Sequence, residues 1–190
     1  MMWAFLGSDV MFFGAFIGTY LIYRGQSLVG PYPKDILDIP VTSISTFVLL
    51  MSSLGIVLAL YYLKEARYSL AKLWLFLVIV MGTTFLMFQV YEFHNFVTEG
   101  LTPRTNMFGT TFFILTGLHG AHVTLGVLWL CTLLFNEFKG ALNTDNAIDL
   151  EIAGLYWHFV DIVWIVIFTV VYLISAHDGG APGSIPFIHG

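Results

Sequence analysis

Five long apolar stretches, each of at least 21 residues, constrain this chain more than any other feature. The hydrocarbon core of a bilayer is about 30 Å thick, so a helix that crosses it needs roughly 20 mostly apolar residues. The five stretches are Trp3–Tyr23, Ser43–Leu63, Leu73–Phe93, Phe108–Phe135 and Ile152–Ser175. They predict an all-α integral membrane protein, a bundle of five transmembrane helices.

The scarcity of charge excludes an ordinary soluble fold. Only 10% of the 190 residues are charged and 58% are hydrophobic, whereas soluble domains carry roughly 25% charged residues. The 7 Lys and Arg residues form no basic stripe, so nucleic acid is excluded as a partner. Cys131 is the only cysteine, so an intramolecular disulfide is excluded as well.

Short connections join the stretches and contain helix-breaking residues. The breakers are Gly30, Pro31, Pro33 and Pro40 in the first connection, Gly100 and Pro103 in the third, and Gly140 and Asn143 in the fourth. This pattern predicts one five-helix domain over residues 1–177 and a short polar tail over residues 178–190. We expect no cleaved signal peptide, because the first stretch lacks a basic leading region.

The distribution of Lys and Arg predicts the orientation, because positively charged short loops stay on the cytoplasmic side. With five spans, the second and fourth loops share a side with the N-terminus. Those loops hold Lys64, Arg67, Lys72 and Lys139, and the opposite loops hold Arg24, Lys34 and Arg104. The compact cluster in the second loop therefore predicts that the N-terminus is inside and the C-terminus outside.

Small residues recur at helical spacing, as is typical of helix contacts in lipid. The pairs are Gly14 with Gly18, Gly55 with Ala59, Gly117 with Ala121, and Gly120 with Thr124. We expect these positions to be places where helices pack closely.

Ionisable side chains inside or beside the spans are the candidate functional residues, because each costs about 2.5–3.5 kcal/mol to insert. They are Asp9, Glu92, His94, His119, His122, Glu151, His158 and Asp161. At 1.5 Å per residue, five of them share a layer between about 9 and 14 Å from the inner surface; these are Asp9, His119, His122, His158 and Asp161. Glu151 is expected near the inner mouth and Glu92 near the outer surface, with His94 on a different face from Glu92.

Three interpretations of these residues stay open. A polar network could fix how the helices pack, with His158 and Asp161 interacting at a spacing of three residues. The inner layer could instead conduct or buffer protons, as Asp, Glu and His chains at depth commonly do. A metal or haem could also be bound, because His119 and His122 are three apart and His158 could face either of them.

Three segments resemble subunit III of the haem-copper respiratory oxidases: WAFLGSDVMFFGAFIGTYL, TTFFILTGLHGAHVTLG and EIAGLYWHFVDIVWIVIF. Two others, VYEFHNFVTEGLTP and PKDILDIPVTSISTFVLLMSS, are similar to the five-helix subunit of bo-type quinol oxidases. The resemblance covers nearly the whole chain. The chain differs from the mitochondrial form of the family in lacking that form's first two helices.

The resemblance implies an accessory subunit of a proton-pumping terminal oxidase in a prokaryotic cell membrane. The partners would be subunits I and II, with the haems and copper held by the catalytic subunit and none by this chain. Phospholipid and a respiratory supercomplex are further partners that the resemblance allows. This chain alone would not be catalytic.

The resemblance also assigns residues. Asp9 takes the place of the family's carbodiimide-reactive carboxylate, and His158 looks like the histidine that contacts it. Five more residues fall on family motif positions: Glu92, His119, His122, Glu151 and Asp161. We therefore predict a direct contact between the side chains of Asp9 and His158.

Three other functions remain as alternatives at this point. One is a subunit III-like accessory protein of nitric oxide reductase. The others belong to a different class and are a free-standing haem-binding cytochrome b and a small proton channel.

Overall fold

The computed structural model describes residues 2–23, 39–98, 107–139 and 147–173. Within these ranges all regular structure is helical, so the prediction of an all-α chain with five helices is confirmed. The elements are α1 (Met2–Tyr23), α3 (Ile39–Lys64), α4 (Tyr68–Thr98), α5 (Met107–Phe138) and α6 (Ala147–Ile167), which the π-helix η2 (Phe168–Leu173) continues.

Four of the helices, α3 to α6, are long and apolar enough to cross a membrane. Helix α1 carries a shorter apolar stretch, Ala4–Thr19. Its full 22 residues correspond to about 33 Å at 1.5 Å per residue, so the whole helix matches the thickness of the hydrocarbon core. Residues 174–175 of the fifth predicted span and the tail from 178 to 190 lie outside the described residues.

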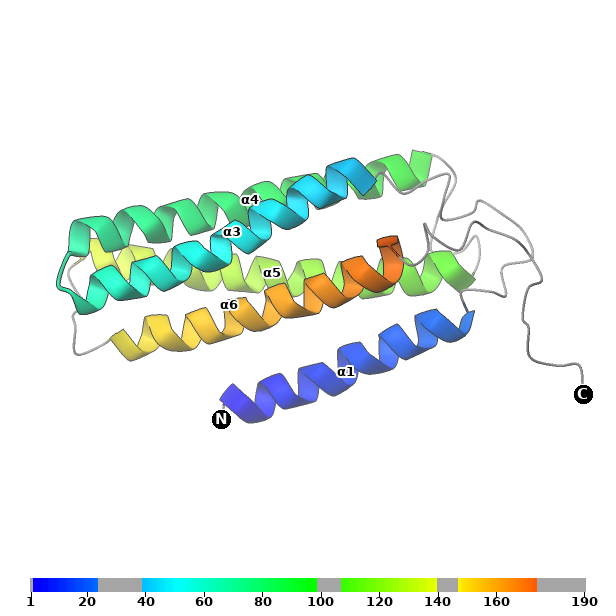
Figure 1. The fold of residues 1–190 in the computed structure, drawn as a ribbon, viewed down its shortest axis with the longest axis horizontal. Helices are drawn as coiled ribbons and strands as arrows, with labels where there is room; N and C mark the ends of the chain where they lie inside the picture. Colours follow the sequence, from blue (N-terminus) through cyan, green and yellow to red (C-terminus); the bar gives the residue numbers. More distant parts are fainter. Residues whose placement is uncertain (1, 24–38, 99–106, 140–146, 174–190) are drawn as a thin grey trace, which may run out of the picture.

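The helices lie side by side and alternate in direction (Figure 1). Helices α1, α4 and α6 run one way, and α3 and α5 run the other way. Helix α3 packs along α4 and α6, while α1 contacts α5 and α6. The end that carries the α3–α4 turn also carries the end of α5 and the start of α6, so the basic residues Lys64, Arg67, Lys72 and Lys139 gather there.

Two helix ends follow local backbone rules. The expectation that Pro40 lies in the first connection is wrong, because α3 begins at Ile39 and Pro40 lies in its first turn. Proline is tolerated there, since the first N–H groups of a helix have no partner inside it. At the other end of α3, Ala66 has a φ of 56°, and the Arg67 N–H donates to the Tyr62 carbonyl at 2.9 Å to close the turn.

Two buried indoles connect α6 to α3. Trp157 Nε1 donates to Ser52 Oγ and Trp164 Nε1 donates to Thr46 Oγ1, both at 2.9 Å. Each tryptophan is nearly fully buried, so these bonds satisfy donors that lipid could not. They fix the rotation of α6 against α3.

Close packing around Trp157 depends on two glycines. A Cβ atom added at Gly82 of α4 would lie 2.7 Å from the Trp157 ring, and one at Gly126 of α5 would lie 2.9 Å from it. The indole of α6 therefore fills the space that these two glycines leave on neighbouring helices.

The predicted small-residue contacts are only partly correct. Gly55 faces Val78 and Gly120 faces Gln89, each at less than 3 Å from an added Cβ, so both predictions are confirmed. Added Cβ atoms at Gly14, Gly18 and Gly117 would meet nothing within 4 Å. The prediction for these three is wrong within the described chain, because the helices rotate them away from their neighbours.

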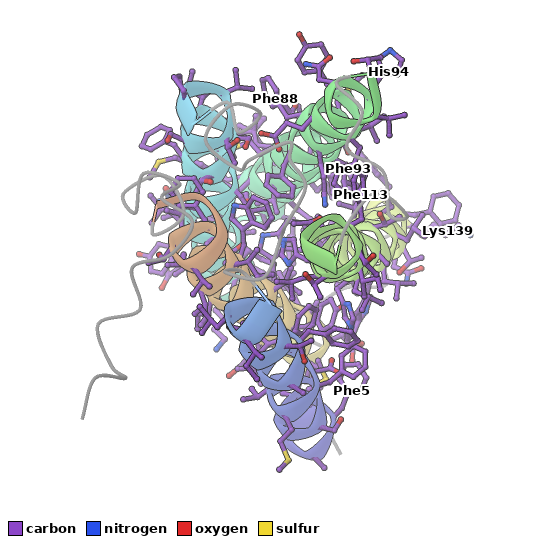
Figure 2. All side chains as sticks on the ribbon, turned by 90° about the vertical axis from the view of Figure 1, so that its right-hand side faces the viewer. Phe5, Phe88, Phe93, His94, Phe113 and Lys139 are labelled. Carbon is purple, nitrogen blue, oxygen red and sulfur yellow. The ribbon has the colours of Figure 1, made fainter. Side chains whose placement is uncertain are left out.

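At the opposite end of the bundle, some side chains of α4 point towards neighbouring helices and others point outward (Figure 2). Phe93 of α4 and Phe113 of α5 meet edge to face with ring centroids 5.1 Å apart, whereas His94 points outward and is exposed. Glu92 is buried and accepts a hydrogen bond from Thr42 Oγ1 of α3. The prediction that Glu92 and His94 face different directions is confirmed.

Candidate functional site

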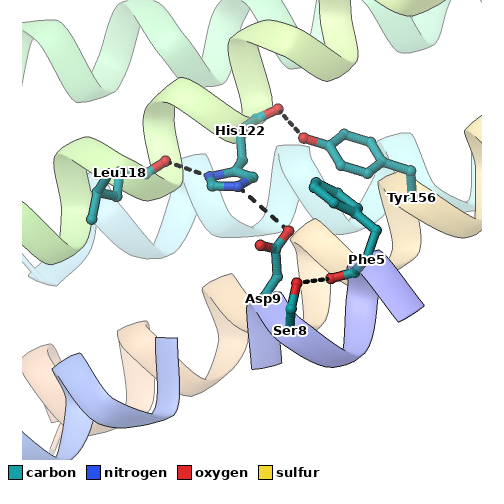
Figure 3. Close-up of polar contacts among 6 residues, drawn as sticks. All are labelled: Phe5, Ser8, Asp9, Leu118, His122 and Tyr156. Atoms are coloured by element: carbon teal, nitrogen blue, oxygen red, sulfur yellow. Dashed lines mark hydrogen bonds and ion pairs between the residues drawn. The ribbon is translucent and has the colours of Figure 1, made fainter. Parts of the chain in front are cut away.

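Asp9 and His122 form an acid–base pair between α1 and α5 (Figure 3). Asp9 Oδ2 lies 3.6 Å from His122 Nε2, and the two side chains are only 14% and 17% exposed. His122 Nδ1 lies 2.8 Å from the carbonyl oxygen of Leu118. Because a carbonyl oxygen can only accept, Nδ1 carries a proton.

The side chains lie at ion-pair distance, and the protonation of Nε2 decides whether they attract each other. With a proton on Nδ1, a neutral His122 would turn the lone pair of Nε2 towards Asp9. A carboxylate there would then face a lone pair, which is repulsive. The arrangement is attractive when Nε2 carries a proton opposite the Asp9 carboxylate or when the Asp9 carboxyl carries it instead. At 3.6 Å the contact is an ion pair and not a hydrogen bond, and Asp9 Oδ2 has no hydrogen-bond partner among the described residues.

Helix α6 holds the pair in place through Tyr156. The Tyr156 hydroxyl donates to the His122 carbonyl at 3.0 Å, and its ring stacks on Phe5 of α1 with centroids 6.4 Å apart. The ring of Phe13, one turn after Asp9, meets the His122 imidazole edge to face at 5.3 Å. Three helices thus converge on the site (Figure 3).

The predicted contact between Asp9 and His158 is wrong. His158 Nδ1 is hydrogen-bonded to Ser53 Oγ of α3, and the acid–base partner of Asp9 is His122. Two residues along a helix correspond to a rotation of about 200°. Because Tyr156 faces α1, His158 must point to nearly the opposite side of α6.

His119 and Asp161 are buried without hydrogen bonds to the described residues. His119 is 0% exposed and stacks on Trp164 with ring centroids 4.7 Å apart, and Phe85 meets its edge at 5.9 Å. Neither ring nitrogen of His119 and neither oxygen of Asp161 has a hydrogen-bond partner in this part of the chain. The expected interaction between His158 and Asp161 is therefore not formed as a hydrogen bond.

His119 and His122 do not converge as two ligands of one metal ion would. His122 is engaged by Asp9 and the Leu118 carbonyl, while His119 is packed between Trp164 and Phe85. Among the residues that the structure describes, no group of three or more His, Cys, Asp or Glu side chains could hold a metal ion. This arrangement does not fit a ligand set drawn from both histidines.

Glu151 lies near the end of the bundle at which α6 begins. Its Oε2 is 3.2 Å from Lys64 Nζ of α3, and both side chains are more than half exposed. Four other candidates, His119, His122, His158 and Asp161, lie deeper along the helices. The structure thus brings Asp9 to His122 and separates both from Glu151 and Glu92.

The sequence alone did not identify the hydroxyl and amide partners. Ser53, Thr42 and Tyr156 bond to His158, Glu92 and the His122 carbonyl. Gln89 Nε2 donates to the Thr116 carbonyl at 2.6 Å. Depth in the bundle could have identified Ser53 as the partner of His158. Ser53 lies 11 residues before the end of α3 (64 − 53), and His158 lies 11 residues after the start of α6 (158 − 147). Because α3 ends where α6 begins, the two side chains lie at the same depth.

Comparison with known proteins finds one family over almost the whole chain. A family model described as cytochrome c oxidase subunit III matches residues 1–176. Cytochrome c oxidase subunit 3 of Alkalihalophilus pseudofirmus is 41% identical over 174 residues, which cover 91% of this chain and 84% of the relative. The probable quinol oxidase subunit 3 of Staphylococcus haemolyticus is 40% identical over 174 residues, or 91% and 87% of the two chains.

Proposed function

Because the chain belongs to the cytochrome c oxidase subunit III family, we propose that it is the accessory subunit of a proton-pumping haem-copper oxygen reductase. It is a multi-pass protein of a prokaryotic cell membrane, and its family is part of a terminal oxidase complex. The proposed role is to support proton uptake by the catalytic subunit and to stabilise that subunit. Subunits I and II are the proposed partners, and they would hold the haems and copper.

The acid–base pair of Asp9 and His122 carries this proposal. The pair is mostly buried and joins a carboxyl of α1 to an imidazole of α5 at ion-pair distance. A group of this kind can keep a proton available near an uptake pathway when its exchange with solvent is slow. Phospholipid and a respiratory supercomplex are additional proposed partners.

The proposed orientation puts this pair in the inner half of the membrane. The start of α1 is directed towards the end of the bundle that carries the basic residues, although it is set in from that end (Figure 1). The basic residues favour that end as the cytoplasmic side. Asp9 lies seven residues after the start of α1 at Met2, or about 10 Å along the helix axis. Protons for oxygen reduction would enter from this side.

Substitution of Asp9 tests the role in proton uptake. In the complete oxidase, Asp9→Asn and Asp9→Ala are expected to lower the number of protons pumped per electron and to speed inactivation during turnover. Asp149→Asn is the matched control, because it alters an exposed carboxylate in the first turn of α6. Unchanged pumping and unchanged inactivation in both Asp9 variants would contradict the proposal.

Co-purification identifies the catalytic partner. A tagged version of this chain should bring a haem-copper subunit with it, and the purified complex should reduce oxygen with cytochrome c or quinol as the electron donor. Recovery with a nitric oxide reductase would replace the proposal with the first alternative. A Soret band in the separately purified chain would support a cytochrome b, and proton flux in liposomes with this chain alone would support a channel.

A further inference from the structure

A second group of polar side chains lies between α3 and α6, apart from the Asp9–His122 pair. Ser53 Oγ is hydrogen-bonded to His158 Nδ1 and lies beside the Asp161 carboxyl. Asp161 is only 3% exposed, and neither of its oxygens accepts a hydrogen bond from the described residues. Ser53 is therefore the hydroxyl that neighbours both an imidazole and a buried carboxyl.

The position of one proton decides how Ser53 serves its two neighbours. A serine hydroxyl has one hydrogen to donate and two lone pairs to accept with. If Ser53 donates to His158 Nδ1, Asp161 receives nothing from it. If His158 Nδ1–H donates to Ser53 instead, the hydroxyl hydrogen is free to turn to Asp161, and the buried carboxyl loses the penalty of having no donor.

His158 also has an approach that Asp161 lacks. A groove of about 410 Å³ between α3 and α6 has His158 in its lining, together with Glu151 and apolar residues such as Leu60 and Leu155. Seven residues separate Glu151 from His158, or about 10.5 Å along the helix. The groove therefore extends from the exposed Lys64–Glu151 pair at the bundle end to the imidazole.

We propose that Asp161, Ser53 and His158 form a second proton-holding site, in which Ser53 passes protons between His158 and the buried carboxyl. A proton from the groove side binds Nε2 of His158, and the Nδ1 proton moves to Ser53 Oγ. The original hydroxyl proton of Ser53 moves to the Asp161 carboxylate. His158 ends neutral with its proton on Nε2, Ser53 is unchanged, and Asp161 has gained one proton.

Three of the four titratable groups that face α6 from neighbouring helices have an ionic partner. Those on its neighbours are Lys64 of α3, His119 and His122 of α5, and Asp9 of α1. Lys64 pairs with Glu151 of α6 itself, and Asp9 pairs with His122. His119 stacks on Trp164, and its ring nitrogens have no hydrogen-bond partner among the described residues. Ser53, which is hydrogen-bonded to His158, is the hydroxyl beside Asp161 through which the proposed transfer runs.

Infrared spectroscopy of the complete membrane complex tests this site. The carbonyl band of protonated Asp161 is identified by its loss in Asp161→Asn, and its exchange is then followed after transfer to D₂O. Ser53→Ala is expected to slow this exchange by about tenfold or more, because the relay hydroxyl is gone. Ser53→Thr keeps a hydroxyl and is expected to exchange at the wild-type rate.

Controls separate the relay from general effects on folding. Ser45→Ala removes another buried hydroxyl of α3, one that bonds to its own helix at the Thr42 carbonyl, and should leave exchange unchanged. If Ser53→Ala does not assemble, Ser53→Cys offers a similar size with a weak donor and should also slow exchange. An unchanged rate in Ser53→Ala or Ser53→Cys would overturn the relay, as would the absence of any band that Asp161→Asn removes.

The outcome is independent of the proposed role of Asp9. Asp9→Asn is expected to leave the exchange of the Asp161 band unchanged, because Asp9 is paired with His122 on the other side of α6. Failure of the Ser53 relay would therefore leave the Asp9 proposal standing, and the reverse also holds.

Discussion

Replacement of Gly82 by alanine tests whether close packing around Trp157 holds the bundle together. The added Cβ would lie 2.7 Å from Trp157 Cη2 and 3.0 Å from Val127 Cγ2. Trp157 is 1% exposed and its indole N–H is bonded to Ser52, so the ring has no free space to move into. We therefore expect the alanine to force a shift of α4 against α6.

The magnitude follows from two opposing contributions. A glycine-to-alanine change inside a helix gains up to about 1 kcal/mol from backbone propensity. Overpacking a well-filled core costs about 1–3 kcal/mol. Gly82→Ala should therefore lower the free energy of unfolding by about 0–2 kcal/mol.

Gly14→Ala is the matched control, because a Cβ there would meet nothing within 4 Å. This variant should keep the propensity gain without the clash, so the two variants should differ by about 1–3 kcal/mol. For a chain of this size, the difference corresponds to about 2–12 °C in unfolding temperature.

The measurement is thermal unfolding of the purified full chain in one detergent and at one scan rate, followed by circular dichroism and tryptophan fluorescence. Gly82→Ala should unfold at the lower temperature, with an altered fluorescence of the native state. Equal unfolding temperatures, or a more stable Gly82→Ala, would refute the inference that Trp157 is held by direct contact with Gly82.

Three further predictions concern the turn, the site and the bundle end. Ala66→Gly should stabilise the chain by about 1 kcal/mol, because Ala66 has a φ of 56° and glycine adopts this conformation without steric cost; a lower unfolding temperature would contradict this. Tyr156→Phe should cost about 1 kcal/mol, because the 3.0 Å bond to the His122 carbonyl is lost, while the stacking on Phe5 is kept. An unchanged unfolding temperature for Tyr156→Phe would show that this bond does not hold the site. Lys64→Ala should change stability by less than about 1 kcal/mol, because its pair with Glu151 is exposed, and a larger loss that persists in high salt would show that the pair is structural.

Helix content and membrane character were readable from the sequence. An apolar stretch of about 20 residues is long enough to cross a bilayer as a helix. In lipid it folds as a helix because a helix satisfies the backbone hydrogen bonds within the stretch itself. The shared depth of Asp9 and His122 was also predictable, because the rise per residue fixes depth once the helix ends are known. Their pairing is consistent with that estimate.

The tertiary structure decided which residues become partners. Sequence spacing fixes which side chains share a face of one helix, but it leaves the rotation of each helix against its neighbours undetermined. That rotation is set by packing, as where Trp157 fits against Gly82 and Gly126 and where the indoles bond to Ser52 and Thr46. With α6 held in that orientation, Tyr156 faces α1 and His158 faces Ser53 of α3. His158 is therefore turned away from Asp9, whose partner is His122 of α5. A contact between helices depends on three-dimensional packing, which the order of residues along one helix does not specify.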